Sequence, residues 1–190
     1  FVNSLATDAM RIKHDITDNN HKNTDSVVNR NTIACSGSPL TCSTTRAERA
    51  VTFLSWSDVA AFLDWAALRP LTELEFEKVA RGPVLPLNGE YAWGSTNITP
   101  ATTISGNEDG TETITNGGNA NVGLTTFSGG DANDGVDNQT GALRNGIFAT
   151  ENSTRESSGA SYYGAMEVSG NVKEYVVTLG NAAGLSFTGV

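Results

Sequence analysis

Apolar residues recur at helical spacing in two neighbouring stretches of the chain. The first stretch follows Ser55, whose hydroxyl can cap a helix, and Asp58 lies three residues further on. Its apolar positions then repeat at i, i+3, i+4 and i+7, which is the period of one helix face. We predict an amphipathic helix over residues 56–67 and expect its apolar stripe to be core. This stripe consists of Val59, Phe62, Leu63 and Ala66.

A second helix is predicted directly afterwards from its start and stop signals. Thr72 and Glu75 fit a capping box, in which each side chain accepts a hydrogen bond from the other residue's backbone amide. Gly82 can adopt the left-handed conformation that ends a helix, and Pro83 prevents its continuation. The segment between Thr72 and Gly82 should therefore be helical.

Regular patterns are scarce in the rest of the chain. Residues 6–50 are polar and rich in turn residues, so we expect them to be irregular. Residues 95–161 are mainly Gly, Asn, Thr and Asp with scattered apolar positions, and residues 175–179 form a short β-like run. Two helices followed by a long, weakly β region predict an α+β fold with little regular structure.

The charge of the chain excludes some partners. Its 190 residues carry 12 basic and 21 acidic side chains, a net charge of −9, and residues 101–190 hold only 3 of the basic ones. So acidic a chain lacks the electrostatic footprint for nucleic acid, and an anionic membrane surface would repel it. No apolar run is long enough to span a bilayer, so we expect no membrane insertion. The excess of carboxylates is instead compatible with bound cations.

The only two cysteines, Cys35 and Cys42, enclose six residues rich in Ser and Thr. This spacing is too wide for a CxxC motif, and no histidine follows closely enough for a zinc site. We predict a local disulfide, which favours an oxidising compartment, and two free buried thiols are the alternative. His14 and His21 have no further ligand-type residues at metal spacing, so we expect both at the surface.

The length of the chain is that of one domain, which can bury a sizeable core without further staples. Phe1 is not an initiator methionine, and residues 1–5 look like the last turn of a helix. The other end stops without a helix cap or a turn. We therefore interpret residues 1–190 as a single domain that is incomplete at both ends.

Four blocks of sequence resemble, in the right order, the formylglycine-generating enzyme family, also called the sulfatase-modifying-factor domain. They are residues 54–66, 68–82, 91–94 and 163–175, of which the last reads YGAMEVSGNVKEY. The resemblance implies a variant of the C-type-lectin-like fold, in which two helices and short strands support long ordered loops. Calcium often helps to order such loops, and structural calcium would account for the acidic, glycine-rich second half.

A first calcium site is implied by the turn over residues 169–174, which resembles one site of the family. Its ligands would be the side chains of Asn171 and Glu174 with the carbonyls of Ser169 and Val172. Amide, carboxylate and carbonyl oxygens are the ligands that calcium prefers. The alternative is that Asn171 and Glu174 only hold a tight turn by hydrogen bonds.

A second calcium site is implied further upstream, in a region of variable length within the family. Its ligands would be the side chains of Asn121 and Asp134 with the carbonyls of Val122 and Val136. Asp131 or Asp137 could replace Asp134, because the alignment is ambiguous there.

The resemblance leaves two classes of function open. The first is a non-catalytic, secreted or cell-surface domain for binding or assembly, whose partner is a protein, a glycan, another copy of the chain or a larger surface complex. The second is a copper-dependent oxidase that generates formylglycine, or a related non-haem-metal oxidoreductase. The family's enzymes bind copper(I) through two late cysteines, which would lie beyond residue 190, and Cys35 and Cys42 precede the first helix. We favour the binding domain, because the sequence contains no catalytic constellation.

Three aromatic residues bear on a glycan partner. Trp93, Tyr162 and Tyr163 could stack on a sugar if they were exposed. The family pattern, however, implies that Trp93 and Tyr163 belong to the core.

Overall fold

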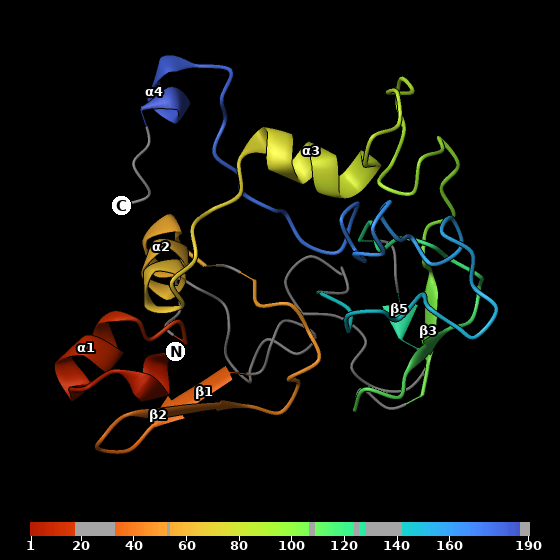
Figure 1. Ribbon diagram of the computed structural model, residues 1–190. Coiled ribbons are helices and arrows are strands. Elements are labelled where there is room, and N and C mark those ends of the chain that lie inside the picture. Colours follow the sequence, from red (N-terminus) through yellow and green to blue (C-terminus); the bar gives the residue numbers. More distant parts are fainter. Residues whose placement is uncertain (18–32, 53, 107–108, 124–125, 128–141, 187–190) are drawn as a thin grey trace.

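The computed structural model describes residues 1–17, 33–52, 54–106, 109–123, 126–127 and 142–186. Figure 1 shows short helices and strands joined by long loops, which is the α+β arrangement predicted from the sequence. In chain order the elements are η1 (Val2–Ser4), α1 (Asp8–Lys13), β1 (Ile33–Ser36), β2 (Thr41–Thr44), α2 (Trp56–Trp65), α3 (Glu73–Arg81), β3 (Thr103–Ser105), β4 (Thr113–Ile114), β5 (Thr126–Phe127) and α4 (Ala182–Leu185).

The first fifty residues contain more regular structure than the sequence predicted. Helix α1 begins after Thr7, whose side chain accepts a hydrogen bond from the Met10 amide, and Asp8 favours its N-terminus. Strands β1 and β2 pair in an antiparallel hairpin. The expectation of an irregular segment is wrong for these elements. The helix is too short to show a period, and the strands are built mainly from small and polar residues instead of alternating apolar ones.

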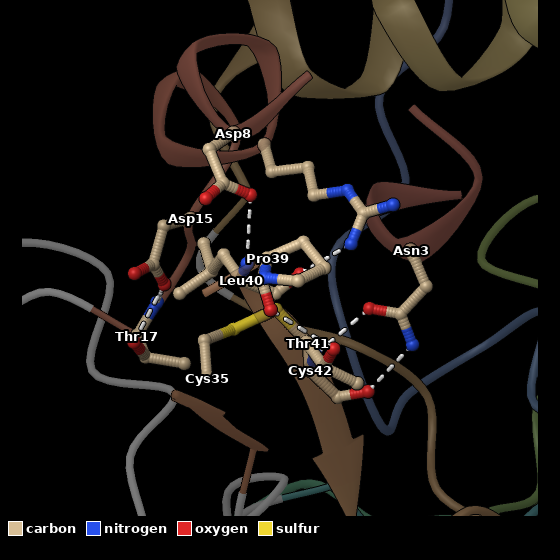
Figure 2. Close-up of a disulfide and its surroundings, with 10 residues drawn as sticks. Asn3, Asp8, Asp15, Thr17, Cys35, Pro39, Leu40, Thr41 and Cys42 are labelled. Atoms are coloured by element: carbon tan, nitrogen blue, oxygen red, sulfur yellow. Dashed lines mark hydrogen bonds between the residues drawn. A yellow bond between two sulfur atoms is a disulfide. The ribbon is translucent and has the colours of Figure 1, made fainter. Parts of the chain in front are cut away.

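A disulfide joins the two strands of the hairpin, as predicted. Cys35 and Cys42 stand opposite each other in the register, with their Cα atoms 4.0 Å apart. Figure 2 shows how the N-terminal segment holds this hairpin. Asn3 donates to the Cys42 carbonyl and accepts from the Cys42 amide, both at 2.8 Å, and Asp8 accepts from the Leu40 amide at 2.8 Å. The hairpin and the N-terminal helices therefore form one connected unit.

Helix α2 starts where the sequence predicted it, but its apolar stripe is not core. Ser55 and Asp58 form a capping box at its N-terminus. No residue of α2 is buried, and Phe62 is 42% exposed. The ring of Phe62 lies 6.0 Å from that of Phe1 and 6.0 Å from that of Trp65. The expectation of a core stripe is therefore wrong, because Phe62 packs against the N-terminal segment.

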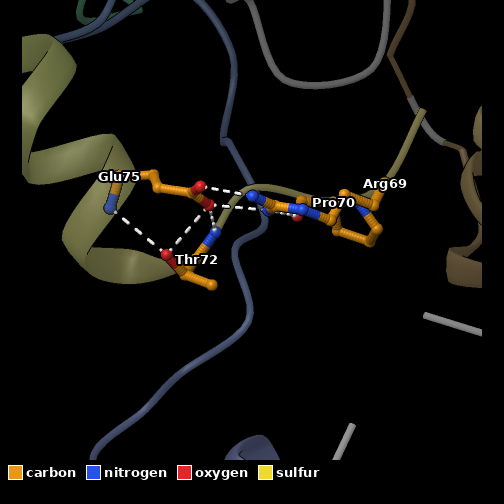
Figure 3. A network of polar contacts seen from close by, with 4 residues as sticks. All are labelled: Arg69, Pro70, Thr72 and Glu75. Atoms are coloured by element: carbon orange, nitrogen blue, oxygen red, sulfur yellow. Dashed lines mark hydrogen bonds and ion pairs between the residues drawn. The ribbon is translucent and has the colours of Figure 1, made fainter. Parts of the chain in front are cut away.

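The N-terminus of α3 is fixed by the predicted capping box and by an arginine. The Thr72 hydroxyl accepts from the Glu75 amide at 3.3 Å, and the Glu75 carboxylate accepts from the Thr72 amide at 2.9 Å. Arg69 donates to both oxygens of the same carboxylate, at 2.8 and 2.5 Å (Figure 3). The hydrogen bonds from Arg69, and then those from Thr72, lower the pKa of Glu75 to about 2.

The segment after residue 175 runs beside α3 without forming a strand of its own. Its contacts are an isolated bridge between Thr72 and Val177 and two hydrogen bonds to Glu73. Glu73 accepts from the Leu179 amide at 2.7 Å and from the Thr178 hydroxyl at 2.9 Å. The β-like run over residues 175–179 is thus reduced to one bridge, because its partner is the start of a helix.

The end of α3 depends on a glycine, as predicted. Gly82 has a φ of 71°, and a Cβ atom there would lie 2.4 Å from the Tyr162 ring. Both the left-handed backbone and the close ring exclude a larger residue. Gly82 therefore ends the helix and also lets the loop carrying Tyr162 pack onto it.

The buried core lies around the second sheet and not on the helices. This sheet has the order β4-β3-β5, with β3 antiparallel to β4 and parallel to β5. The core cluster consists of Ala101, Ile104, Leu143, Ile147 and Phe148. Trp93, which lies in a loop, is also buried, with 3% of its surface exposed, as the family pattern implied.

None of the helices in the described residues is long and apolar enough to cross a bilayer.

The capping interaction at α3 predicts a pH-dependent loss of stability. Glu75→Gln should lower the melting temperature at pH 7, because the amide cannot reproduce the ion pair with Arg69. The folded-state pKa of Glu75 lies below its ordinary value, so the carboxylate stabilises the fold above that ordinary value and loses this effect as the pH falls toward 2. Thermal melts at pH 7 and pH 3 should therefore show a smaller difference between variant and parent at pH 3. An equal difference at both pH values would contradict this account.

Candidate metal site

The turn over residues 169–174 is organised by the side chain of Asn171. Its backbone has a φ of 64°, a left-handed conformation that asparagine tolerates better than most residues. The Asn171 amide oxygen accepts from the Leu143 amide at 2.7 Å and from the Asn121 side-chain nitrogen at 3.1 Å. Its amide nitrogen donates to the Leu143 carbonyl at 3.2 Å. One side chain thus joins three segments of the chain.

One predicted ligand from each of the two calcium sites lies at this turn. The Asn171 backbone amide donates to the Asn121 carbonyl at 2.8 Å, so Asn121 of the second site contacts Asn171 of the first. Asn121 is 4% exposed, and its side-chain oxygen accepts from the Gly123 amide at 3.1 Å. Gly170 has a φ of 110°, and a Cβ atom there would lie 2.7 Å from the Asn121 carbonyl oxygen. The close approach of these two segments therefore requires glycine at 170.

The hydrogen bonds of Asn171 are those expected if this residue only holds a tight turn, which is the alternative to calcium binding. Its side-chain oxygen accepts two hydrogen bonds, which uses both of its lone pairs. As a calcium ligand, Asn171 would have to give up one of them. The Ser169 hydroxyl accepts from the Ala92 amide at 2.9 Å and so ties the turn to the loop before Trp93. The Ser169 carbonyl and the Asn171 side chain as calcium ligands stay predictions.

A cavity of about 540 Å³ opens beside this turn. Three of the residues predicted for the first site line it, namely Asn171, Val172 and Glu174. The described lining also includes a second acid, Glu167, which the sequence reasoning missed. The cavity therefore brings two carboxylates together with amide and carbonyl oxygens, which is the chemistry of a site for a hard cation.

Glu174 stands at the exposed rim of this cavity. The surrounding protein raises the pKa of its carboxyl to about 7, and a backbone hydrogen bond only partly offsets this effect. Access to solvent reduces the free-energy cost of its ionisation.

Glu167 lies deeper and is half-buried. Its carboxylate accepts from the Gly146 amide at 2.8 Å, and its backbone has a φ of 56°. Burial raises the pKa of Glu167, while this hydrogen bond and the charge of Arg144 oppose the rise. The signal in the sequence was a carboxylate seven residues before Glu174 in the same family block. A positive φ at a non-glycine residue marks a position that the surrounding structure holds in place.

The other predicted ligands give less information. Val122, the carbonyl ligand of the second site, is 44% exposed. Asp134 and Val136, with the alternatives Asp131 and Asp137, lie outside the described residues. Across the part of the chain that the structure describes, no group of three or more His, Cys, Asp or Glu residues gathers as a metal site. A cation beside Glu167 and Glu174 would therefore need backbone and amide oxygens as well.

The two cysteines cannot act as copper ligands in this structure. Cys35 and Cys42 are joined in a disulfide, so neither supplies the thiolate that copper(I) prefers. They are the only cysteines in the sequence. These 190 residues therefore contain no pair of free thiols for copper(I).

These features define a small α+β domain in which side-chain hydrogen bonds hold long loops around an acid-lined cavity. The family model of the sulfatase-modifying factor enzyme 1-like domain, FGE-sulfatase, matches residues 12–182. The chain belongs to this family, which confirms the resemblance seen in the four sequence blocks. No curated protein and no solved structure gives a match.

Replacing Asn171 should reveal how much its hydrogen bonds contribute. Asn171→Ala should lower the free energy of unfolding by about 2–4 kcal/mol, because it leaves the backbone of buried Leu143 unpaired and places alanine at a positive φ. Asn171→Gly avoids the backbone strain but does not restore the side-chain hydrogen bonds, so it should recover only part of the lost free energy of unfolding. Urea denaturation followed by circular dichroism measures both.

The control is Asn152→Ala, an exposed asparagine in a turn, which should change the free energy of unfolding by less than about 0.5 kcal/mol. If Asn171→Ala unfolded at the same urea concentration as the parent, the hydrogen bonds of Asn171 would not stabilise the domain.

Proposed function

We propose that this chain is a non-catalytic member of its family, an extracellular or cell-surface domain for binding or assembly that calcium stabilises. The observation that carries the proposal is the cavity shared by Glu167 and Glu174. Glu167 and Glu174 both line this cavity, and burial raises the pKa of each carboxyl, so ionising either one without a cation carries a cost. Calcium would remove that cost and would tie the turn to the loop at Gly146.

The chemistry of the cavity supports calcium more than a transition metal. The described lining offers carboxylate, amide and carbonyl oxygens and no histidine or cysteine. Oxygen-only sites suit calcium and magnesium, and calcium accepts the irregular geometry that loops provide. Glu167, Glu174 and the Val172 carbonyl are the ligands we propose first. Asn171 would join them only by exchanging a hydrogen bond.

The overall architecture supports a C-type-lectin-like fold for this family member. Two capped helices and short strands carry long loops, and the buried core is built largely from those loops. In such a fold the exposed parts of the loops supply the binding surface, while their buried residues form the core. The family assigns the scaffold, whereas a binding role has to come from its surface.

The surface carries features that suit a protein or glycan partner. Tyr163 is 59% exposed, which makes the expectation that it is core wrong, and its ring lies 4.9 Å from that of Tyr162. Tyr162 packs on Gly82 and is 43% exposed, so Tyr163 is the more accessible ring for stacking on a sugar face. The net charge of −9 favours a neutral or basic partner over an anionic one.

The disulfide supports the proposed location. Cys35 and Cys42 are bonded across the hairpin, and structural disulfides persist mainly in oxidising environments. Secretion or display at a cell surface would provide such an environment. It would also provide the millimolar calcium that weak sites in extracellular modules need.

Calcium binding predicts a chelator-dependent loss of stability. At a calcium concentration about a hundredfold above the dissociation constant, the melting temperature should be roughly 5–10 °C higher than in EGTA. Glu174→Gln should abolish most of this difference, because it removes a charged ligand. In EGTA at pH 8, the same variant should be at least as stable as the parent, since it no longer ionises a carboxyl whose pKa is raised to about 7.

The matched control is Glu151→Gln, which removes the same charge from an exposed turn and should keep the full response to calcium. Differential scanning calorimetry measures all three proteins. A melting temperature of the parent protein that does not depend on calcium would contradict the calcium proposal. If Glu174→Gln showed the same calcium-dependent rise in melting temperature as the parent, the ion would have to bind outside this cavity.

A further inference from the structure

A second cavity lies at the other end of the chain, between the N-terminal segment, the hairpin and α2. Its volume is about 460 Å³, which is within the range of small-molecule sites. No described residue lines both this cavity and that of Glu167 and Glu174. It is therefore a separate site, and neither the family blocks nor the calcium proposal accounts for it. Its main apolar lining residues are Phe1, Val2, Ile33, Val51, Leu54 and Phe62.

The wall formed by the hairpin is rigidly built. Cys35 and Cys42, which are joined by the disulfide, both line the cavity. Asn3 fixes the Cys42 backbone by two hydrogen bonds of 2.8 Å, as Figure 2 shows. On the opposite wall, Phe62 belongs to α2 and its ring meets that of Phe1. A cavity with fixed walls loses little entropy when it binds a ligand.

One polar pair interrupts this apolar lining. The His14 ring nitrogen Nδ1 lies 3.4 Å from the Asp58 carboxylate, and both side chains line the cavity. The His14 side chain is 24% exposed and that of Asp58 only 12%, so His14 is not the free surface residue that the sequence predicted. Asp58 is held in turn by the Ser55 amide within the capping box of α2.

This pair determines which chemical group a ligand should carry. A carboxylate only accepts hydrogen bonds, so Nδ1 of His14 must carry the proton that it shares with Asp58. In the neutral ring, Nε2 is then an acceptor, and among the described residues it has no hydrogen-bond partner. A ligand that donates an N–H or O–H group would satisfy it. Asp58 adds a negative charge, which disfavours anionic ligands.

We propose that this cavity binds a small, uncharged, largely aromatic or aliphatic molecule that carries one hydrogen-bond donor for His14. Apolar walls with a few polar groups are the usual lining of small-molecule sites. The apolar part would pack between Phe62 and the disulfide, and the donor would reach His14 Nε2. The proposal does not depend on calcium, because none of the described residues lines both cavities.

The test uses two probes that share one aromatic skeleton. N-phenylnaphthylamine is uncharged, has one N–H group and becomes fluorescent in apolar surroundings. Anilinonaphthalenesulfonate has the same skeleton with an added negative charge. The complete chain should bind one molecule of N-phenylnaphthylamine, with a dissociation constant below about 100 μM. The sulfonate should bind at least about tenfold more weakly because of Asp58.

Two matched variants test whether the probe occupies this cavity. Val51 lines the cavity and is 44% exposed, whereas Val84 lies outside its described lining and is 51% exposed. Val51→Glu places a second negative charge in the cavity and should abolish binding of N-phenylnaphthylamine. Val84→Glu adds the same charge elsewhere and should leave binding unchanged. Both substitutions are at exposed positions, and equal melting temperatures check that both variants are folded.

A third variant tests the hydrogen bond. His14→Phe keeps a ring beside Phe1 but removes both nitrogens, so it should weaken binding of N-phenylnaphthylamine about three- to tenfold. The proposal is overturned if the probe does not bind, if Val51→Glu binds it as tightly as the parent, or if both valine variants lose binding equally. Unchanged affinity in His14→Phe would overturn the role of His14 and the need for a donor.

Discussion

The fold depends on the hydrogen bonds of one side chain, Asn171. Its amide group joins the backbone at Leu143 to the side chain of Asn121, and its backbone amide bonds to the Asn121 carbonyl. In a domain with few strands, these side-chain bonds pair buried backbone groups of the loops, which in a sheet would be paired by neighbouring strands. Leu143 is itself part of the buried core, so the turn and the core hold each other in place.

Other polar side chains repeat this arrangement at the edges of the domain. At the start of α3, hydrogen bonds from the Thr178 hydroxyl and the Leu179 amide lower the pKa of Glu73. Those from Arg69 and Thr72 lower the pKa of Glu75. Arg155 donates to the Ala92 carbonyl at 2.7 Å and so ties two loops together. Glu174 differs from the acids at α3, because the surrounding protein raises the pKa of its carboxyl to about 7. The acids that hold backbone groups at α3 thus have lowered pKa values, whereas the acid at the rim of the cavity has a raised one.

The sequence predicted those features whose causes are local. Both capped helices were predicted because a capping box lies within four neighbouring residues, and the disulfide because its loop is short. The core was not predicted, since Ile104 and Leu143 lie in loops and strands with no period to recognise. At the candidate site, Asn171, Val172 and Glu174 came from the family block. Glu167 was missed because its place beside Glu174 depends on how the chain turns between them.

The two cavities differ in what a ligand would change. The cavity of Glu167 and Glu174 is part of the turn that holds the core, so an ion there would act on the stability of the whole domain. The cavity beside His14 is bounded by the disulfide hairpin and by α2, which has no buried residue, so a ligand there would leave the core unchanged. If both proposals hold, an ion would act on stability at one cavity and a small molecule would bind at the other.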